Sequence, residues 1–467
     1  MQSYSMLIDG SLVATPEQDL VINPAKAAPF ATCARANAGH VDAAVAAAAR
    51  AYPSWRRDEA LRRQKLNECA AALQTRAADI AQLLTQEQGK PIGNSMMEVF
   101  GASMWFSYFA GLEVAPQVLQ DDGEKRIQVI TKPLGVVAAI TPWNFPIVLL
   151  AWKLAPALLA GNTVVAKPSE FTPLSSLLLA EIFNDILPPG VLNVLAGPGA
   201  VGAQLAGHPA VRKISFTGSV ATGKKIMQYA ASDLKRVTLE LGGNDPAIVL
   251  DDVDPSAVID NLFWGAFTNS GQICTAIKRL YVHESVYAPI VDGLIERAKA
   301  VKVGDGLEPD TQLGPINNKM QFDKVVGLVD DARQHGARIA VGGAPLDRPG
   351  YFYPPTIVTE VHAGVRLVDE EQFGTALPVL KYRNLDDVIE EANRTHYGLG
   401  GSIWTSDIAR GEQLAQRLES GTGWVNQHMD ITPFAPFGGC KWSGLGYENG
   451  KWGFEEFTEL QVVNVRK

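Results

Sequence analysis

A cysteine and a glutamate lie in two short segments whose neighbours suit nucleophilic chemistry. Cys274 lies in Asn269-Ser-Gly-Gln-Ile-Cys-Thr275, where the glycine three residues earlier permits a close backbone approach and polar neighbours predict partial access. Glu240 lies between apolar neighbours in Thr238-Leu-Glu-Leu-Gly-Gly243. Removal from water raises the pKa of a carboxyl group, which suits a general base. Taken alone, each residue also fits a structural role, as an inert buried thiol or a satisfied structural acid.

Two further segments add an amide and a glycine loop. Asn144 lies in Thr141-Pro-Trp-Asn-Phe-Pro146, between a predicted buried strand and a predicted buried helix. Its amide is either the cap of that helix or a fixed donor to a developing oxyanion. Phe216-Thr-Gly-Ser-Val-Ala-Thr-Gly-Lys-Lys225 follows a strand and opens a helix, where phosphate groups often bind. Position 225 lacks the hydroxyl of a phosphate-binding loop, so this loop alone is a weak nucleotide signal.

The composition excludes several classes of protein. The 467 residues carry a net charge of −9, with 46% hydrophobic and 19% charged residues and no basic stripe, which argues against nucleic-acid binding and against disorder. The cysteines form no metal-ligand spacing, so we expect no metal site and a reducing compartment. The first residues lack the basic start and apolar run of a secretory signal, which predicts a cytoplasmic protein.

One apolar stretch, residues 134–166, is long enough to span a bilayer and carries a single charge, Lys153. Pro142, Pro156 and Asn162 are among the residues that interrupt it every few positions. A membrane helix tolerates few such breaks. The stretch is therefore predicted to be a buried strand, a turn, a buried helix and a second buried strand.

The middle of the chain alternates between short apolar strands and amphipathic helices. Such alternation predicts parallel strands joined by right-handed crossovers, with ligands at the carboxyl ends of the strands. Strands are predicted at 135–140, 163–166, 192–195, 213–216, 237–241 and 247–250, with helices beginning near 148, 172, 200, 219 and 255. A second alternating block covers about 279–425, with helices near 284–301 and 317–335.

The rest of the chain is simpler in pattern. The first third is predicted to be mainly helical, at 41–51 and 58–88, until Gly89-Lys90-Pro91 ends the helical run. Residues 127–132 and 459–465 are predicted as isolated strands, of a kind that often pairs across a subunit boundary.

Seven motifs in chain order resemble those of the aldehyde dehydrogenase superfamily, and the resemblance runs essentially from end to end. They are Thr141-Pro-Trp-Asn-Phe-Pro146 (active-site asparagine), Lys167-Pro-Ser-Glu170 (adenine ribose), Phe216-Thr-Gly-Ser219 with Gly223 (coenzyme loop), Leu239-Glu-Leu-Gly-Gly243 (general base), Gly271-Gln-Ile-Cys274 (nucleophile), Glu371-Gln-Phe-Gly374 (nicotinamide ribose), and Pro436-Phe-Gly-Gly439 with Lys441, Ser443 and Gly444. Two positions depart from the pattern. The family often has lysine where this chain has Asn244, and usually has proline where it has Thr375.

The resemblance implies an α/β protein with two Rossmann-like α/β domains and a small bridging β oligomerisation element. The coenzyme-binding domain would comprise residues 1–114 and 134–242, and the catalytic domain residues 243–444. Residues 115–133 and 445–467 would form the oligomerisation element. A homodimer or homotetramer is expected, without nucleic-acid or membrane partners.

The resemblance also implies oxidation of a small-molecule aldehyde to the carboxylic acid. Cys274 would attack the carbonyl, and the Asn144 amide with the Cys274 backbone N–H would hold the oxyanion. Glu240 would activate the water that hydrolyses the thioester. Family members that transfer the acyl group to coenzyme A commonly lack this carboxylate, so the free acid is the expected product. Glu170, supported by Lys167, would bind the ribose hydroxyls and repel a 2′-phosphate, which predicts NAD in preference to NADP.

Two sets of contact residues follow from the resemblance. The coenzyme set is Thr141, Pro142, Trp143, Lys167, Ser169, Glu170, Gly199, Phe216, Thr217, Gly218, Ser219, Gly223, Leu241, Glu371 and Phe373. The substrate set is Phe145, Leu149, Trp152, Ile273, Thr275, Met429, Ile431 and Phe437. The second set is mostly apolar and aromatic, which suits an alkyl or aryl aldehyde.

Other functions remain open at this stage. The substrate set lacks arginine, which weakens but does not remove a carboxylate-bearing semialdehyde as substrate. His428 and Asp430 either bind a polar tail of the substrate or are simply solvated. A thiol esterase without hydride transfer is one competing class, and a binding protein that has lost the chemistry is another. The binding protein would be expected to lack the nucleophile or the base, and both are present.

Overall fold

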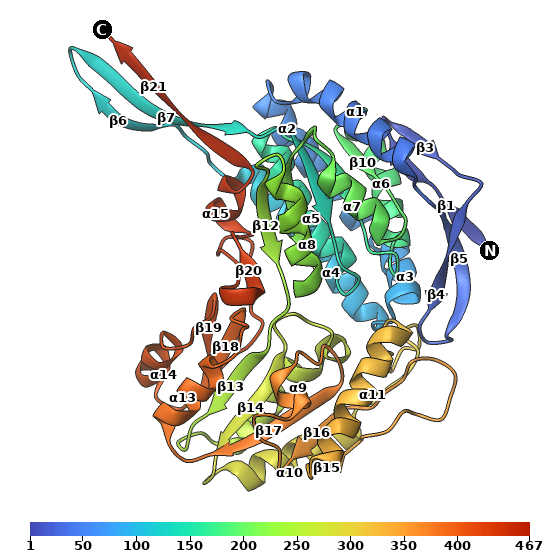
Figure 1. Cartoon of the computed structure of the whole chain (residues 1–467), viewed down its shortest axis with the longest axis vertical. Helices are drawn as coiled ribbons and strands as arrows, with labels where there is room; N and C mark the ends of the chain where they lie inside the picture. Colours follow the sequence, from blue (N-terminus) through green and yellow to red (C-terminus); the bar gives the residue numbers. More distant parts are fainter.

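The computed structural model describes residues 1–467 and contains two large sheets (Figure 1). The first has eight strands: β2 (Met6–Ile8), β3 (Ser11–Val13), β8 (Val136–Ile140), β9 (Thr163–Lys167), β10 (Leu192–Val194), β11 (Val211–Thr217), β12 (Arg236–Glu240) and β20 (Gly444–Leu445). Their order is β20-β12-β11-β8-β9-β10-β2-β3. The five inner strands, β12 to β10 in that order, are parallel, and the outer three pair antiparallel.

The second large sheet has seven strands: β13 (Asp245–Val249), β14 (Ile277–His283), β15 (Arg338–Val341), β16 (Thr356–Thr359), β17 (Ala376–Tyr382), β18 (Gly400–Trp404) and β19 (Thr422–Val425). Their order is β15-β16-β17-β14-β13-β18-β19. All neighbours are parallel except β15 and β16. Both sheets are therefore built from strand–helix alternation, and the predicted α/β class is confirmed.

Helices cover both large sheets. The helices that precede or connect the strands of the first sheet are α1 (Ala38–Trp55), α2 (Glu59–Thr75), α3 (Ala77–Gln88), α4 (Ile92–Gly111), α5 (Pro146–Ala160), α6 (Leu174–Asn184), α7 (Gly199–Gly207) and α8 (Val220–Ala231). Those of the second sheet and the C-terminal region are α9 (Pro255–Phe267), α10 (Tyr287–Ala300), α11 (Lys319–Gln334), α12 (Arg366–Asp369), α13 (Leu385–Asn393), α14 (Ile408–Ala415) and α15 (Gly450–Glu455).

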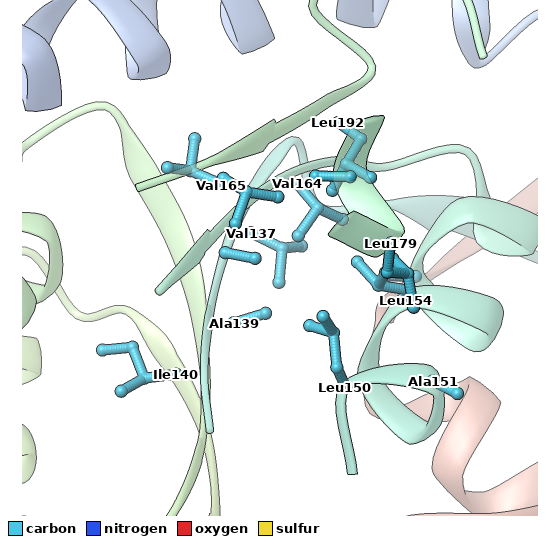
Figure 2. Packing of buried hydrophobic residues seen from close by; sticks show 14 of the residues in the cluster. Val137, Ala139, Ile140, Leu150, Ala151, Leu154, Val164, Val165, Leu179 and Leu192 are labelled. Carbon is cyan, nitrogen blue, oxygen red and sulfur yellow. The ribbon is translucent and has the colours of Figure 1, made fainter. Parts of the chain in front are cut away.

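The unit β8–α5–β9 is the centre of the first core and carries the site described below. Every residue of β8 and β9 is buried, and fourteen of the fifteen residues of α5 are also buried. Pro146 is the first residue of α5, where it fits the helical φ without losing a hydrogen bond, and Gly161 ends the helix with φ 96°. Figure 2 shows Leu150 and Leu154 of α5 packed toward Val137 and Val164 of the sheet. Burial of each such leucine contributes about 1.5–3 kcal/mol.

The predicted elements of the middle of the chain are present. Each of the six strands predicted between residues 134 and 250 is found, displaced by at most two residues at either end. The last of them, β13, belongs to the second sheet. The apolar stretch that was tested as a membrane span is β8, a turn, α5 and β9, as predicted. None of the helices combines the length and the apolar character that crossing a membrane requires.

The N-terminal third differs from its prediction. The first 34 residues hold five short strands, among them β1 (Gln2–Tyr4), β4 (Gln18–Asn23) and β5 (Ala28–Ala34), which form a three-stranded sheet of order β1-β5-β4. The predicted helical run at 58–88 is two helices, α2 and α3, separated at Arg76. α4 follows the Gly89-Lys90-Pro91 stop and was not predicted.

A second small sheet projects from the body as an arm (Figure 1). It contains β6 (Gln117–Asp121), β7 (Lys125–Pro133) and β21 (Thr458–Arg466), in the order β21-β7-β6. β7 and β21 are the two strands that the sequence predicted as isolated, and they pair antiparallel with each other over their whole length. The outer edges of β21 and β6 have no partner strand in this chain.

Candidate active site

The site lies at the carboxyl edge of the first sheet, where four parallel strands end. The segments that follow β8, β9 and β11 carry the asparagine motif, the Lys167–Glu170 pair and the glycine loop, and β12 ends at Glu240. The strand register sets Ile140 beside both Lys167 and Phe216, and Thr217 beside Glu240. The sheet thus gathers motifs that are far apart in the sequence, as expected for an α/β fold.

Cys274 lies in a turn between a short 3-10 helix (Thr268–Gly271) and β14. The turn is strained, because Asn269 and Ser270 have φ of 52° and 56° and Gly271 has φ of 71°. A Cβ on Gly271 would lie 2.2 Å from the carbonyl oxygen of Gly374, so only glycine fits there. The backbone N–H of Cys274 has no hydrogen-bond partner in the structure and is free to bind a ligand.

Burial raises the pKa of the Cys274 thiol to about 12. Lys278 lowers this pKa, whereas the carboxylates of Glu240, Asp245 and Glu371 raise it. The thiolate is the reactive form of cysteine, so its formation here needs a base or a change of surroundings when ligands bind. Lys278 is the one cation among the groups that shift the pKa of Cys274.

Asn144 joins the first sheet to the cysteine turn. Its Nδ2 donates to the carbonyl oxygen of Gln272 at 3.0 Å, and its Oδ1 is buried without a partner. The Asn144 carbonyl oxygen accepts hydrogen bonds from Asn269 Nδ2 at 3.2 Å and from Lys90 Nζ at 2.8 Å. The amide is therefore a fixed donor beside the turn that carries Cys274. It does not cap α5, whose N-cap is Phe145 without a side-chain hydrogen bond.

A buried ion pair supports this loop and was not found from the sequence. Lys90 donates to Glu98, and both side chains are at most 1% exposed. Glu98 Oε1 accepts from the backbone N–H groups of Ile147 at 2.9 Å and Val148 at 3.3 Å, in the first turn of α5. The pair therefore holds the peptide of Asn144 and the start of α5 together. The sequence marked Lys90 only as part of a helix stop.

Glu240 is 3% exposed, and neither of its carboxyl oxygens has a hydrogen-bond partner. Burial raises the pKa of this carboxyl group well above its ordinary value. Glu448 raises the pKa further, and Lys153 lowers it. Lys153 forms a buried ion pair with Glu448 and donates to Thr217 Oγ1 at 2.8 Å. A buried acid with free oxygens and a raised pKa is suited to proton transfer near neutral pH.

The predicted coenzyme residues line the same edge. Lys167 Nζ lies 3.4 Å from Glu170, whose side chain is 43% exposed and free to bind hydroxyl groups. Ser219 caps the N-terminus of α8 by accepting from Thr222 N–H. A Cβ on Gly223 would lie 2.7 Å from Leu241, so this glycine lets α8 pack closely on the strand end. Pro142, Ser169 and Gly218 lie in the loops of these strand ends, Phe216 lies near the end of β11, and Gly199 begins α7.

Glu371 and Phe373 come to this edge from the second sheet's side. Glu371 Oε1 accepts from the Gly243 N–H at 3.1 Å, and Phe373 packs edge-on against Trp143 with ring centroids 5.3 Å apart. The two positions that depart from the family pattern hold backbone nearby. Asn244 Nδ2 donates to Val368 O at 2.8 Å, and Thr375 Oγ1 donates to Tyr353 O at 3.1 Å.

The predicted substrate residues come from three segments. Phe145, Leu149 and Trp152 belong to α5 or its start, Ile273 and Thr275 flank the nucleophile, and Met429, Ile431 and Phe437 lie after β19. Trp152 packs on Phe437 with ring centroids 5.4 Å apart and stacks on Trp105 of α4, also at 5.4 Å. Trp105 was not predicted, because nothing in the sequence of α4 links it to this region.

His428 is enclosed within the protein. Its side chain is 0% exposed, with Nε2 2.7 Å from the Thr275 carbonyl oxygen and Nδ1 2.9 Å from Ser402 Oγ. Burial lowers the pKa of the ring to about 3, which keeps it neutral at ordinary pH. The imidazole therefore supports the turn after Cys274. Asp430, by contrast, is exposed to solvent.

Comparison with known proteins decides the family. The model of the aldehyde dehydrogenase family matches residues 14–463. The chain belongs to the aldehyde dehydrogenase family. Retinaldehyde dehydrogenase 3 of Rattus norvegicus is 42% identical over 433 residues, which cover 91% of this chain and 84% of the relative. The chloroplastic betaine aldehyde dehydrogenase of Beta vulgaris is 39% identical over 460 residues, or 95% and 92% of the two chains.

Solved structures of family members have the same fold. The NAD⁺ complex of betaine aldehyde dehydrogenase from Staphylococcus aureus matches with a TM-score of 0.96 at 34% identity, over 99% of this chain and 95% of that one. The NAD⁺ complex of an aldehyde dehydrogenase from Bacillus cereus matches with a TM-score of 0.97 at 36% identity, over 100% and 97%. The family assignment makes this chain an aldehyde dehydrogenase, an oxidoreductase.

Proposed function

We propose that this aldehyde dehydrogenase oxidises an apolar or aromatic aldehyde to the free carboxylic acid with NAD. The observation that carries the proposal is the presence of two groups without hydrogen-bond partners, one at the end of β12 and one in the turn before β14. These are the buried carboxyl group of Glu240 and the backbone N–H of Cys274. The Asn144 amide is held near Cys274 by its hydrogen bond to the carbonyl oxygen of Gln272. A nucleophile, an oxyanion donor and a base are the parts that acyl chemistry through a thiol requires.

The first step is addition of the Cys274 sulfur to the aldehyde carbon. The S–C bond forms, the C=O electron pair moves to oxygen, and the thiol proton is lost to a base. The oxyanion accepts hydrogen bonds from the Asn144 amide and the Cys274 N–H. Removal of one donor of this kind typically lowers kcat by about 10²–10³. The rigid attachment of Asn144 through Lys90 and Asn269 supports this role.

NAD, when bound, would supply the acceptor for the hydride that leaves the former aldehyde carbon. Thr141, Lys167, Ser169, Glu170, Gly199 and the 216–223 loop would hold it, with Glu371 and Phe373 at its reactive end. Two observations support the fit. Thr141 Oγ1 is buried without a partner, and a Cβ on Gly199 would meet nothing within 4 Å.

Hydrolysis of the Cys274 thioester completes the reaction. Glu240 takes a proton from water as the water oxygen adds to the acyl carbon, and the C–S bond then breaks with the electron pair returning to sulfur. The products are the free acid and the regenerated cysteine. The raised pKa of Glu240 supports this role, because the carboxylate of a weaker acid is a stronger base than an ordinary one.

Glu170 supports a preference for NAD over NADP. Its carboxylate can accept hydrogen bonds from both ribose hydroxyls, while a 2′-phosphate would bring a second negative charge beside it. Lys167, on the same segment, is 4% exposed and directed at Glu170, so its charge is already engaged. A 2′-phosphate would therefore find little free positive charge here.

The aromatic set around Trp152 supports an apolar or aryl substrate.

The projecting arm supports a homodimer or homotetramer, because its outer strands leave unpaired backbone groups and expose Leu460 and Val462. All four cysteines are free, which is consistent with a cytoplasmic protein. The domain boundaries given above remain a prediction.

One experiment tests the proposed function directly. Aliphatic, aromatic and carboxylate-bearing aldehydes are assayed with NAD and with NADP, with and without coenzyme A, and the acid product is identified. We expect NADH formation with the first two classes and release of free acid without coenzyme A. Ester hydrolysis without any reduction of coenzyme would instead favour the thiol esterase, and obligatory coenzyme A would contradict the hydrolytic step.

A further inference from the structure

Lys278 is a buried lysine of β14 whose ammonium group is directed back at the nucleophile's turn. Its side chain is 2% exposed. Nζ donates to the carbonyl oxygen of Ile273 at 2.8 Å and to that of Cys274 at 2.6 Å, and lies 3.6 Å from Glu371 Oε1. The two carbonyl oxygens take two of the three N–H donors of the ammonium group, and the Glu371 carboxylate lies at ion-pair distance.

The hydrogen bond to Ile273 has a consequence across the peptide bond. The chain contains no cis peptide, and in a trans peptide the C=O and the following N–H point in opposite directions. By holding the Ile273 carbonyl, Lys278 therefore directs the Cys274 N–H away from itself. The same carbonyl also accepts from Ala276 N–H at 3.2 Å, which fixes the peptide plane from a second side.

We propose that Lys278 is a positioning residue, which holds the Cys274 backbone N–H as an oxyanion donor and joins the nucleophile's turn to Glu371. The inference rests on the proposed function, because it needs an oxyanion at Cys274. Glu371 also accepts from the Gly243 N–H, so one carboxylate links Lys278 to the segment that follows Glu240. A movement of Glu371 on coenzyme binding would therefore be transmitted to the Cys274 turn by the Lys278 side chain.

Lys278 is the cation that acts on Cys274, and the other polar residues nearby do not take this role. Asn244, which immediately precedes the neighbouring strand β13 and stands where the family often has lysine, is uncharged and is bound to Val368. The guanidinium of Arg279 is bound to the carbonyl oxygens of Asn244 and Ala392. The acidic groups that act on Cys274 are Glu240, Asp245 and Glu371, and all three oppose thiolate formation.

The chain offers a matched control for substitution of Lys278. Lys235 has a side chain that is 0% exposed, and its Nζ also binds a backbone carbonyl, that of His208, and a carboxylate, that of Asp233. Lys278→Met and Lys235→Met thus remove the same group from similar surroundings, and only the first is next to Cys274. We expect both variants to lower the melting temperature. Lys278→Met should lower kcat at least about tenfold, whereas Lys235→Met should keep kcat within about twofold.

A second measurement separates positioning from loss of stability. The rate of Cys274 alkylation by iodoacetamide is followed against pH in the absence of aldehyde. Because Lys278 lowers the pKa of Cys274, its removal moves the rate–pH curve to higher pH. Lys235→Met should leave the curve in place, and so should Asn144→Ala, which lowers kcat without changing the charge.

Lys278→Gln keeps the test decisive if Lys278→Met does not fold. Its amide retains a donor for the carbonyl groups but lacks the charge, so kcat should recover in part while the alkylation curve stays displaced. Wild-type kcat and an unmoved curve in either variant would overturn the inference. That result is distinct from failure of the proposed function, which would appear as full dehydrogenase activity in Cys274→Ala.

Discussion

Lys90 Nζ lies 2.8 Å from the carbonyl oxygen of Asn144 and forms a buried ion pair with Glu98. The pair therefore holds the loop that carries the proposed oxyanion donor. Lys90 binds the carbonyl group of Asn144, and Glu98 binds the first N–H groups of α5. Burial lowers the pKa of Lys90, and Glu98 opposes this by stabilising the charged form.

Lys90→Met should lower kcat between about tenfold and a hundredfold, because displacement of a catalytic group by about 1 Å has costs of this order. It should also destabilise the protein by about 3–5 kcal/mol, since Glu98 is left buried and unpaired. Arg62→Met is the control, because Arg62 is also buried and binds the Leu159 carbonyl at the opposite end of α5. Loss of stability without loss of kcat is expected there. If both variants lowered kcat equally, Lys90 would only stabilise α5 and would have no specific role at Asn144.

Cys274→Ala should abolish aldehyde oxidation, with a fall on the order of a thousandfold or more. The measurement is NADH formation at saturating aldehyde and NAD. Cys69→Ala, which removes another buried thiol, in α2, should stay active. Mass spectrometry of a quenched reaction should also find the acyl group on Cys274 in the wild type. Residual activity near the wild-type rate would contradict the assignment of the nucleophile.

Glu240→Gln should slow thioester hydrolysis about a hundredfold, a typical contribution of a general base. A rapid first turnover of NADH followed by a slow steady state is expected. In the wild type the steady-state rate should rise with pH as the carboxyl group, whose pKa is raised, becomes ionised. A single slow phase in the variant would indicate that Glu240 acts before hydride transfer instead.

Glu240 also predicts a pH dependence of stability. Its pKa is raised in the folded state, so folding binds the proton more tightly than the unfolded chain does. The stabilising contribution is full below the unfolded pKa and is lost as pH rises through the folded pKa. Glu240→Gln mimics the protonated acid, so its free energy of unfolding should exceed that of the wild type increasingly with pH. Denaturant titrations at several pH values measure this, and a constant difference would contradict the shift.

Glu170→Gln should raise the ratio of NADP to NAD efficiency. Loss of one charge repulsion in a solvated site is worth roughly 1 kcal/mol, or about fivefold in kcat/KM. Initial rates with each coenzyme measure the ratio. Asp9→Asn is a useful control, because it removes a carboxylate that contacts Arg50 and is not among the proposed coenzyme residues. An unchanged ratio in Glu170→Gln would remove the argument for NAD preference.

Leu460→Lys combined with Val462→Lys should dissociate the proposed oligomer. The two side chains are 72% and 60% exposed and alternate along one face of β21. Gln461→Lys places one positive charge on the opposite face and should leave the assembly intact. Light scattering gives the mass of each variant. A wild-type chain that is already monomeric would refute the oligomer.

Several parts of the fold were readable from local sequence. β8, α5 and β9 follow from apolar runs bounded by Pro146 and Gly161, where burial and turn chemistry agree. The strands of the first 34 residues were not predicted, because in β4 hydropathy does not follow burial: Leu20 is at an exposed position and the polar Asn23 at a buried one. The break at Arg76 was also missed, since it carries neither glycine nor proline.

The supporting residues of the site were harder to find. Lys90 acts on the backbone of a residue 54 positions away, and backbone contacts of this kind leave no pattern in the sequence. Trp105 likewise meets Trp152 only through packing of α4 on α5. Lys278 is different, because it lies four residues after Cys274. A lysine so near a nucleophile was a local signal that the sequence offered.

The segment from β20 to β21 has a consequence for biosynthesis. β20 pairs with the end of β12, including Glu240 itself, and Glu448 enters the buried ion pair with Lys153 before the chain continues into β21. A ribosome delivers this segment after every other strand of both large sheets. The surroundings of Glu240, the proposed base, thus stay incomplete until translation has passed residue 448. A nascent chain is therefore expected to form the proposed coenzyme-binding loops before it can oxidise an aldehyde.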